Sequence, residues 1–130
     1  MAFEWPVRIY WEDTDAGGIV FYANYLKFFE RARTEWTRAL GVDQTRLKED
    51  EGAVFAVRRV EADYLSPARF DDELIVTTAP HRITPARIEL DQQVLRGEQV
   101  LFRARVTLAC LGPDMRPRRL PGDLAALMGS

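Results

Sequence analysis

The feature of the sequence that most constrains the fold is one long helical pattern in a chain that otherwise alternates in the manner of β-strands. Between residues 25 and 40, large apolar side chains return every three or four positions, which places them on one face of an α-helix. Charged residues lie mostly on the other face, and Gly41 follows as a natural C-cap. The apolar face consists of Tyr25, Phe29, Ala32, Trp36 and Leu40 or Ala39. Such a helix needs a covering surface, which the rest of the chain must supply.

The rest of the chain is expected to form mostly strands. A short strand is expected at residues 7–11, and residues 42–50 are expected to form a second helix or a loop with Asp43 as its cap. The pattern at residues 120–128 is compatible with a terminal helix. One long helix after a first strand, followed by consecutive antiparallel strands, predicts an α+β fold with a curved sheet wrapped around the helix, although periodicity alone leaves other α+β folds open. The later strands are expected at residues 54–65, 74–78 with an extension toward residue 83, 87–95 and 100–111.

Length and composition limit the class of protein. At 130 residues the chain can bury one real core but not two, so residues 1–130 are expected to form a single domain. The net charge is −2 with acidic and basic residues well mixed, which predicts no nucleic-acid surface. No apolar run approaches the roughly 20 residues of a membrane span, and the first residues lack the features of a signal peptide. We therefore expect a cytoplasmic protein without membrane insertion.

The single cysteine and the single histidine argue against several kinds of site. Cys110 lies in an apolar strand pattern, so we interpret it as a small core residue in a reducing compartment. His81 follows Pro80 far from the other candidate residues, and we expect it at the surface. With one residue of each kind, a zinc site and a Cys–His pair are both unsupported, and no metal or cofactor is expected. No Gly-x-Ser-x-Gly motif occurs, which argues against an α/β-hydrolase.

The segment directly before the helix is suited to attack on a carbonyl group. Asp15 precedes a pair of glycines, Gly17 and Gly18, which allow a tight turn and the close approach of another molecule. Asn24 is a good N-cap for the helix, whose first amides would be unpaired donors with partial positive charge. A carboxylate beside such donors could supply or activate a nucleophile while the donors stabilise an oxyanion. On local composition alone, however, the same residues fit an ordinary polar turn.

A longer match decides in favour of a functional role. Residues 7–10 followed by Glu-Asp-Thr-Asp-Ala-Gly-Gly at residues 12–18 closely resemble the opening of hotdog-fold acyl-CoA thioesterases of the YbgC type, which are related to 4-hydroxybenzoyl-CoA thioesterases. The match continues at residues 28–35, 64–72 and 117–121, and so covers nearly the whole chain. The resemblance implies a hotdog fold, with a curved antiparallel sheet of about five strands around one long central helix. It also implies hydrolysis of acyl-CoA to free acid and CoA, without a cofactor, by a homodimer or homotetramer.

The resemblance also assigns roles to residues. Asp15 takes the position of the catalytic carboxylate, which could attack the thioester carbonyl itself or act as a general base on water. The backbone N–H of Tyr22 takes the position of the oxyanion donor. The YbgC type commonly has a histidine where this chain has Tyr22, so a mechanism based on a side-chain imidazole is in doubt. The residues implied to contact substrate are Gly17, Gly18, Phe21, Asn24, Pro67 and Arg69, the last two belonging to a segment that lines the site from the partner subunit in the family.

Several alternatives stay open at this level. A second thioesterase lineage places its catalytic Glu on the helix, which makes Glu30 a reserve candidate, although we assign Glu30 and Glu35 to surface pairs with Arg31, Arg33 and Arg38. We expect Asp13 to bond the loop backbone. The arginines at positions 116, 118 and 119 could meet CoA phosphates, but we favour a solvated tail.

Substrate and activity also leave alternatives. Acyl preference would depend on the surroundings of Phe21, Tyr22 and Phe55, and the Phe21-Tyr22 pair favours short-chain or aromatic acyl groups. The alternative function is a non-catalytic module of the cell-envelope machinery that binds acyl-CoA or an acyl-carrier protein. A dehydratase on the same fold is disfavoured, because no histidine lies near the motif.

Overall fold

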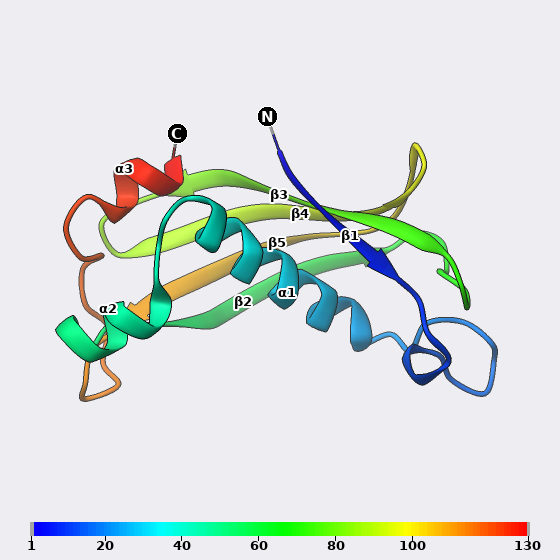
Figure 1. Ribbon diagram of the computed structural model, residues 1–130, viewed down its shortest axis with the longest axis horizontal. Coiled ribbons are helices and arrows are strands. Elements are labelled where there is room, and N and C mark those ends of the chain that lie inside the picture. The colour runs from blue at the N-terminus through cyan, green and yellow to red at the C-terminus, as the bar shows by residue number, and fades with distance from the viewer. Residues whose placement is uncertain (1, 130) are drawn as a thin grey trace.

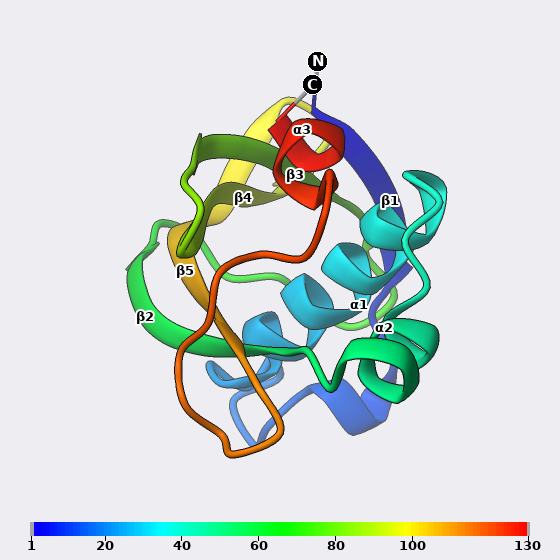
Figure 2. The ribbon, with the colours of Figure 1, turned by 90° about the vertical axis from the view of Figure 1, so that its left-hand side faces the viewer.

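A single long helix crosses the concave face of one curved sheet in the computed structural model, which describes residues 2–129 (Figure 1). The sheet has five strands in the order β1-β3-β4-β5-β2, and every neighbouring pair is antiparallel. Viewed from one end, the sheet curls around the helix (Figure 2). This is the hotdog arrangement that the sequence predicts. In chain order the elements are β1 (Phe3–Arg8), a 3-10 turn η1 (Trp11–Asp13), α1 (Asn24–Ala39), α2 (Gln44–Glu51), β2 (Val54–Tyr64), β3 (Glu73–Ile83), β4 (Arg87–Arg96), β5 (Gln99–Leu111) and α3 (Leu124–Gly129).

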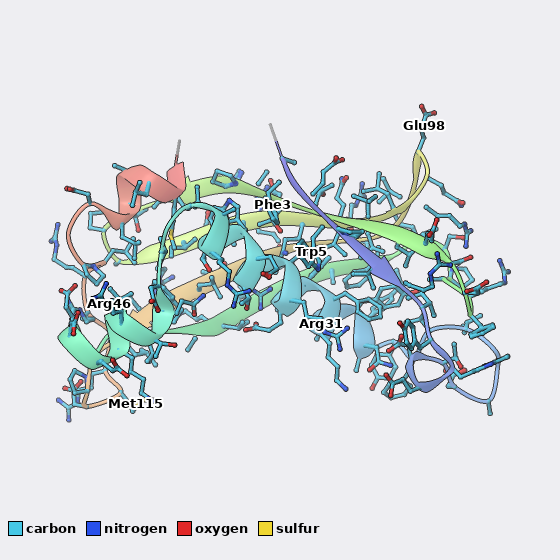
Figure 3. The ribbon with its side chains drawn as sticks, in the orientation of Figure 1. Phe3, Trp5, Arg31, Arg46, Glu98 and Met115 are labelled. Atoms are coloured by element: carbon cyan, nitrogen blue, oxygen red, sulfur yellow. The ribbon has the colours of Figure 1, made fainter. Side chains whose placement is uncertain are left out.

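The core lies between α1 and the concave face of the sheet. Phe28, Phe29 and Ala32 of α1 are completely buried; alternate residues of β3 and β4 and most residues of β5 are also buried. Burying a large apolar side chain contributes about 1.5–3 kcal/mol, so this face accounts for much of the stability. Phe3 and Trp5 of β1, labelled in Figure 3, are partly buried and pack against the same core. The predicted apolar face of the helix is confirmed, with Phe28 as an added member.

The first strand differs from its prediction. The sequence predicts it at residues 7–11, whereas β1 runs over Phe3–Arg8 and pairs with β3 in the register Phe3↔Thr78 to Arg8↔Glu73. The chain leaves the sheet after Arg8 because the Asp13 carboxylate accepts a hydrogen bond from the backbone N–H of Tyr10 at 2.8 Å, which bends the chain into η1. The other predicted elements occur within a few residues of their expected bounds, and the Asp43 side chain caps α2 by accepting from Arg46 N at 3.1 Å.

One charged residue of α1 is buried, although the sequence places it at the surface. Arg33 is only 8% exposed, and its guanidinium donates to Oε1 of Gln92 on β4 at 2.9 Å. Gln92 in turn donates to the hydroxyl of Thr78 at 2.9 Å and to the carbonyl of Phe29 at 3.2 Å. Burial lowers the pKa of Arg33, and the ion pair with Glu30 opposes that shift. This network of buried hydrogen bonds links α1 to the middle of the sheet.

Replacement of Gln92 tests how much this hydrogen-bond network contributes to stability. Gln92→Leu keeps the volume but removes the acceptor of Arg33 and the donor to Thr78, so the unfolding free energy should fall by about 1–3 kcal/mol because buried polar groups lose partners. Denaturant unfolding measures the change. Gln93→Leu is the matched control, since Gln93 is the next residue of the strand, points to the opposite side of the sheet and is only partly buried. Equal stability of the two variants would contradict a stabilising role for the hydrogen-bond network.

None of the helices within residues 2–129 is both long and apolar enough to cross a membrane.

Candidate active site

The candidate catalytic loop, residues 14–23, joins η1 to α1 and is closed by its own backbone. Thr14 and Val20 form an isolated antiparallel bridge, and the N–H of Asp15 donates to the carbonyl of Ile19 at 3.0 Å. The N–H of Gly18 donates back to the carbonyl of Asp15 at 3.0 Å, and Gly18 has a φ of +78°. Residues other than glycine rarely adopt this backbone conformation, so Gly18 is needed for the turn itself. The closed turn lies at one end of the molecule (Figure 1).

The Asp15 carboxylate is exposed and has a defined orientation. Its Oδ1 accepts a hydrogen bond from the backbone N–H of Gly17 at 2.8 Å. A Cβ atom added to Gly17 would lie 3.2 Å from the same oxygen, which is closer than an ordinary contact. Gly17 therefore leaves room for the carboxylate while its amide holds one of the two oxygens. The other oxygen is available to a substrate or to water.

The loop is attached to the start of α1 through Asp13 and Asn24. The carbonyl of Asp13 accepts from the N–H of Phe21 at 3.0 Å and from the side-chain amide of Asn24 at 2.9 Å. This corrects the expectation that Asn24 is the N-cap, because Ala23 occupies that position and makes no side-chain cap bond. The amide side chain of Asn24 is turned toward the loop instead. The Asp13 carboxylate bonds a backbone N–H, as expected, but it is that of Tyr10, which precedes the loop.

Tyr22 lies near the end of the loop, and its backbone N–H has no acceptor among residues 2–129. The Tyr22 carbonyl accepts from the hydroxyl of Tyr64 on β2 at 2.9 Å. The Tyr22 side chain is 64% exposed, and its ring meets the ring of Phe21 at 4.9 Å between centroids. A free N–H close to the start of a helix, where the helix dipole is positive, is suited to bind an oxyanion.

The segment with Pro67 and Arg69 packs beside this loop within the same chain. Ala68, between them, is completely buried; its carbonyl accepts from Val20 N at 2.9 Å, and its N–H donates to the hydroxyl of Tyr25 at 3.0 Å. Ile19 and Arg69 form an isolated bridge. The structure thus brings together the loop, the start of α1 and the segment around residue 68.

Other candidate residues lie elsewhere. Glu30 is two turns into α1 and pairs with Arg33. The C-terminal loop with its three arginines lies at the end of the molecule opposite the loop at residues 14–23 (Figure 1), and Arg118 bonds the carbonyl of Glu51 at 3.0 Å. Phe55 stands at the start of β2, about 30 Å along the strand from Tyr64. It lines a cavity of about 110 Å³ beside Trp36, and so is not a neighbour of Phe21.

The cysteine and the histidine occupy the positions that the sequence predicts. Cys110 is buried, and burial raises the pKa of its thiol. His81 is partly exposed and lies 3.3 Å from a guanidinium nitrogen of Arg105. Among residues 2–129 no cluster of three or more His, Cys, Asp or Glu side chains is arranged to hold a metal ion.

Comparison with known proteins identifies the family. The model of the thioesterase-like superfamily matches residues 9–127. The chain is 42% identical to the acyl-CoA thioesterase YbgC of Haemophilus influenzae over 125 residues, which are 95% of this chain and 92% of that protein. The chain belongs to the YbgC family of acyl-CoA thioesterases. It is therefore a thioester hydrolase.

Two further thioester-cleaving or probable thioesterase proteins are similar to this YbgC family member. A probable thioesterase from Bartonella henselae has a solved structure with a TM-score of 0.89 and 38% identity, covering 93% of this chain and all (100%) of that one. A 1,4-dihydroxy-2-naphthoyl-CoA hydrolase from Thermosynechococcus vestitus is 32% identical over 94% of this chain and 85% of that protein.

Tyr64 was given no role by the sequence. It begins one of the segments that match the YbgC family, but residues 22 and 64 are 42 positions apart. The hydrogen bond between them arises only when β2 is placed beside the start of α1.

Proposed function

We propose that this protein hydrolyses the thioester bond of a short-chain or aromatic acyl-CoA, with Asp15 as the catalytic carboxylate and the backbone N–H of Tyr22 as the oxyanion donor. The observation that carries the proposal is the loop at residues 14–23. It presents an exposed carboxylate, oriented by Gly17, together with the Tyr22 N–H, which has no acceptor among residues 2–129. Attack on a carbonyl group needs both kinds of group.

Two chemical routes are compatible with this arrangement. In the first, an Asp15 oxygen bonds to the thioester carbon, the carbon–sulfur bond breaks, CoA leaves as its thiolate, and water then hydrolyses the mixed anhydride. In the second, Asp15 takes a proton from a water molecule that attacks the same carbon. Both routes place negative charge on the carbonyl oxygen, which the Tyr22 N–H would stabilise. Because thiols have a pKa of about 8.5, the thiolate is a good leaving group without protonation by a strong acid.

The substrate class is inferred from the aromatic side chains beside the loop. Phe21 is 42% exposed and Tyr22 is 64% exposed, so their rings offer an apolar surface to an acyl group. Aromatic rings pack well against one another, and a short chain would cover the same surface. The naphthoyl-CoA hydrolase among the relatives also supports an aromatic substrate.

We place a second copy of the chain against the edge strand β2. Every residue of β2 from Val57 to Tyr64 is exposed, and the apolar Val57 and Val60 are 48% and 37% exposed. An unpaired edge with exposed apolar side chains favours pairing with another strand. Since β2 ends at Tyr64, beside Tyr22, a partner on this edge would also shelter the site and could bring its own Pro67 and Arg69 near. Two such dimers would give a homotetramer.

Replacing the carboxylate tests the catalytic assignment. Asp15→Asn should lower kcat at least about hundredfold, because the neutral amide neither attacks nor accepts a proton. Release of CoA thiol is followed on acetyl-, butyryl-, palmitoyl- and benzoyl-CoA. Asp13→Asn removes the same charge two residues away and keeps an acceptor for Tyr10, so it should lose less than about tenfold. Full turnover by Asp15→Asn would refute the assignment.

A substitution at Gly17 tests the position of the Asp15 carboxylate without removing the carboxylate. Gly17→Ala places a methyl group 3.2 Å from Oδ1 of Asp15, so the carboxylate must shift and kcat should fall about three- to thirtyfold. The matched control is Gly112→Ala, whose Cβ would lie 3.4 Å from Oδ1 of Asp114, away from the loop. The control should keep wild-type kcat. Equal rates for all three proteins would argue against a precisely placed Asp15 carboxylate.

A charge on the β2 edge tests the assembly. Val60→Glu should shift the protein to a monomer, because it would place two carboxylates in an apolar contact, and hydrolysis should fall with it. Analytical ultracentrifugation gives the mass. Leu127→Glu, on α3, introduces the same group at a position that is 45% exposed and should leave the assembly intact. A monomeric wild-type protein with full activity would rule out the proposed dimer.

A further inference from the structure

We propose that the hydroxyl of Tyr64 is a positioning group for the oxyanion donor: it holds the carbonyl of Tyr22 and thereby aims the Tyr22 N–H. The inference rests on the proposed function, because it concerns the donor assigned there. It adds a residue from β2 to a site otherwise built by residues 13–24 and the segment around Ala68. The contact that motivates it is the 2.9 Å hydrogen bond from Tyr64 to the Tyr22 carbonyl.

Hydrogen bonds hold three consecutive peptide groups of the backbone around Tyr22. The first is held where the N–H of Phe21 donates to the carbonyl of Asp13 at 3.0 Å. The second carries the Tyr22 N–H, and its carbonyl, that of Phe21, accepts from the N–H of Asn24 at 2.9 Å. The third is held where the Tyr22 carbonyl accepts from Tyr64. Each of the three peptides is therefore held by one hydrogen bond, while the Tyr22 N–H has no acceptor among residues 2–129 and can bind a ligand.

The Tyr64 bond differs from the other two in its origin. The bonds to Asp13 and Asn24 come from the same loop and helix start, so they move with it. Tyr64 belongs to β2 and is paired with Phe102 of β5 in the register of the sheet. Its hydroxyl therefore restrains rotation about the Cα of Tyr22 relative to the rigid sheet. An oxyanion donor is effective when it is already oriented before the charge develops.

The Tyr64 ring is itself well anchored. It packs against the ring of Phe102 at 4.6 Å between centroids, against Tyr25 at 5.7 Å and against Tyr22 at 6.3 Å. Partial burial and the nearby Tyr22 raise the pKa of Tyr64, so its hydroxyl keeps its proton at neutral pH and can donate. The hydroxyl is thus presented by an aromatic cluster that continues into the core.

Tyr64→Phe tests the inference, because it removes the hydroxyl and keeps the ring contacts. Loss of one hydrogen bond of ordinary strength that acts on the transition state should lower kcat about three- to tenfold. KM should be unchanged, because the hydroxyl touches Tyr22 and not the substrate. The assay is thiol release from butyryl- and benzoyl-CoA, run at a temperature at which circular dichroism shows each protein fully folded. Tyr10→Phe is the matched control, since the Tyr10 side chain is 59% exposed, and it should keep the wild-type constants.

The outcomes separate the possible roles of the hydroxyl. An unchanged kcat overturns the inference. A raised KM with an unchanged kcat also overturns it, since the hydroxyl would then bind substrate. A purely structural role would lower the melting temperature without changing kcat at a temperature at which the protein is folded, and this too is a negative result.

A second measurement follows the backbone directly and needs no substrate. Selective ¹⁵N-tyrosine labelling gives amide signals for the four tyrosines of the chain, and Tyr22→Phe identifies the signal of residue 22. In Tyr64→Phe the Tyr22 amide signal should move and broaden, while that of Tyr10 should stay in place. An unmoved Tyr22 signal contradicts the inference even if the activity falls. Full hydrolysis by Asp15→Asn would refute the proposed function, whereas an intact kcat in Tyr64→Phe beside an inactive Asp15→Asn refutes only the role of Tyr64.

Discussion

The packing of α1 against the concave face of the sheet is the contact on which the rest of the structure depends. It buries Phe28, Phe29 and Ala32 completely, and Arg33 adds a polar tie to Gln92 in the middle of the sheet. The core reaches the start of α1, where Tyr25 is 3% exposed and its hydroxyl accepts from the N–H of Ala68, so the first turn is fixed against the segment around residue 68. The first residue of α1 is Asn24, which holds the candidate catalytic loop. The core therefore sets the position of the loop without contributing a side chain to it.

The loop itself is ordered by hydrogen bonds, and the N–H of its Tyr22 has no acceptor among residues 2–129. Several of its backbone groups bond within the loop, to Asp13, to Asn24 or to Ala68, which is completely buried. An N–H without a partner is costly when it is buried, but the surroundings of Tyr22 are exposed, so water can bind there until a ligand replaces it. An ordered donor that remains accessible is what stabilisation of a developing oxyanion requires.

The edge strand β2 connects this site to the proposed assembly. The outer face of the sheet carries ion pairs such as Asp63–Arg103 and Asp91–Arg105, which suit contact with solvent. The β2 edge instead exposes Val57 and Val60 and ends at Tyr64, beside Tyr22. The same strand would therefore pair with a second chain and restrain the backbone of the oxyanion donor. Loss of the partner would then affect catalysis as well as assembly.

Much of the fold follows from local pattern. The helix at residues 25–40 and the strands after residue 54 could be predicted because one-sided burial leaves a period of about 3.6 or 2 residues in the sequence. The first strand was misplaced, because residues 7–11 alternate as a strand would, while the Asp13 side chain bends the chain at Tyr10. Arg33 was assigned to the surface, because no local pattern shows that Gln92, 59 positions away, offers it a buried acceptor.

The sequence by itself determined the family, the hotdog fold and the choice of Asp15 and Tyr22 as candidates, because a long run of specific residue types carries that information directly. Only the tertiary structure decided that Asn24 bonds Asp13 rather than capping the helix, that Phe55 is remote from Phe21, and that Tyr64 holds the Tyr22 carbonyl. The physical reason is that a hydrogen bond depends on distance and direction between groups. That distance and direction are set by the curvature of the sheet and by the position of α1 against it. Both depend on contacts between residues that are far apart in the sequence.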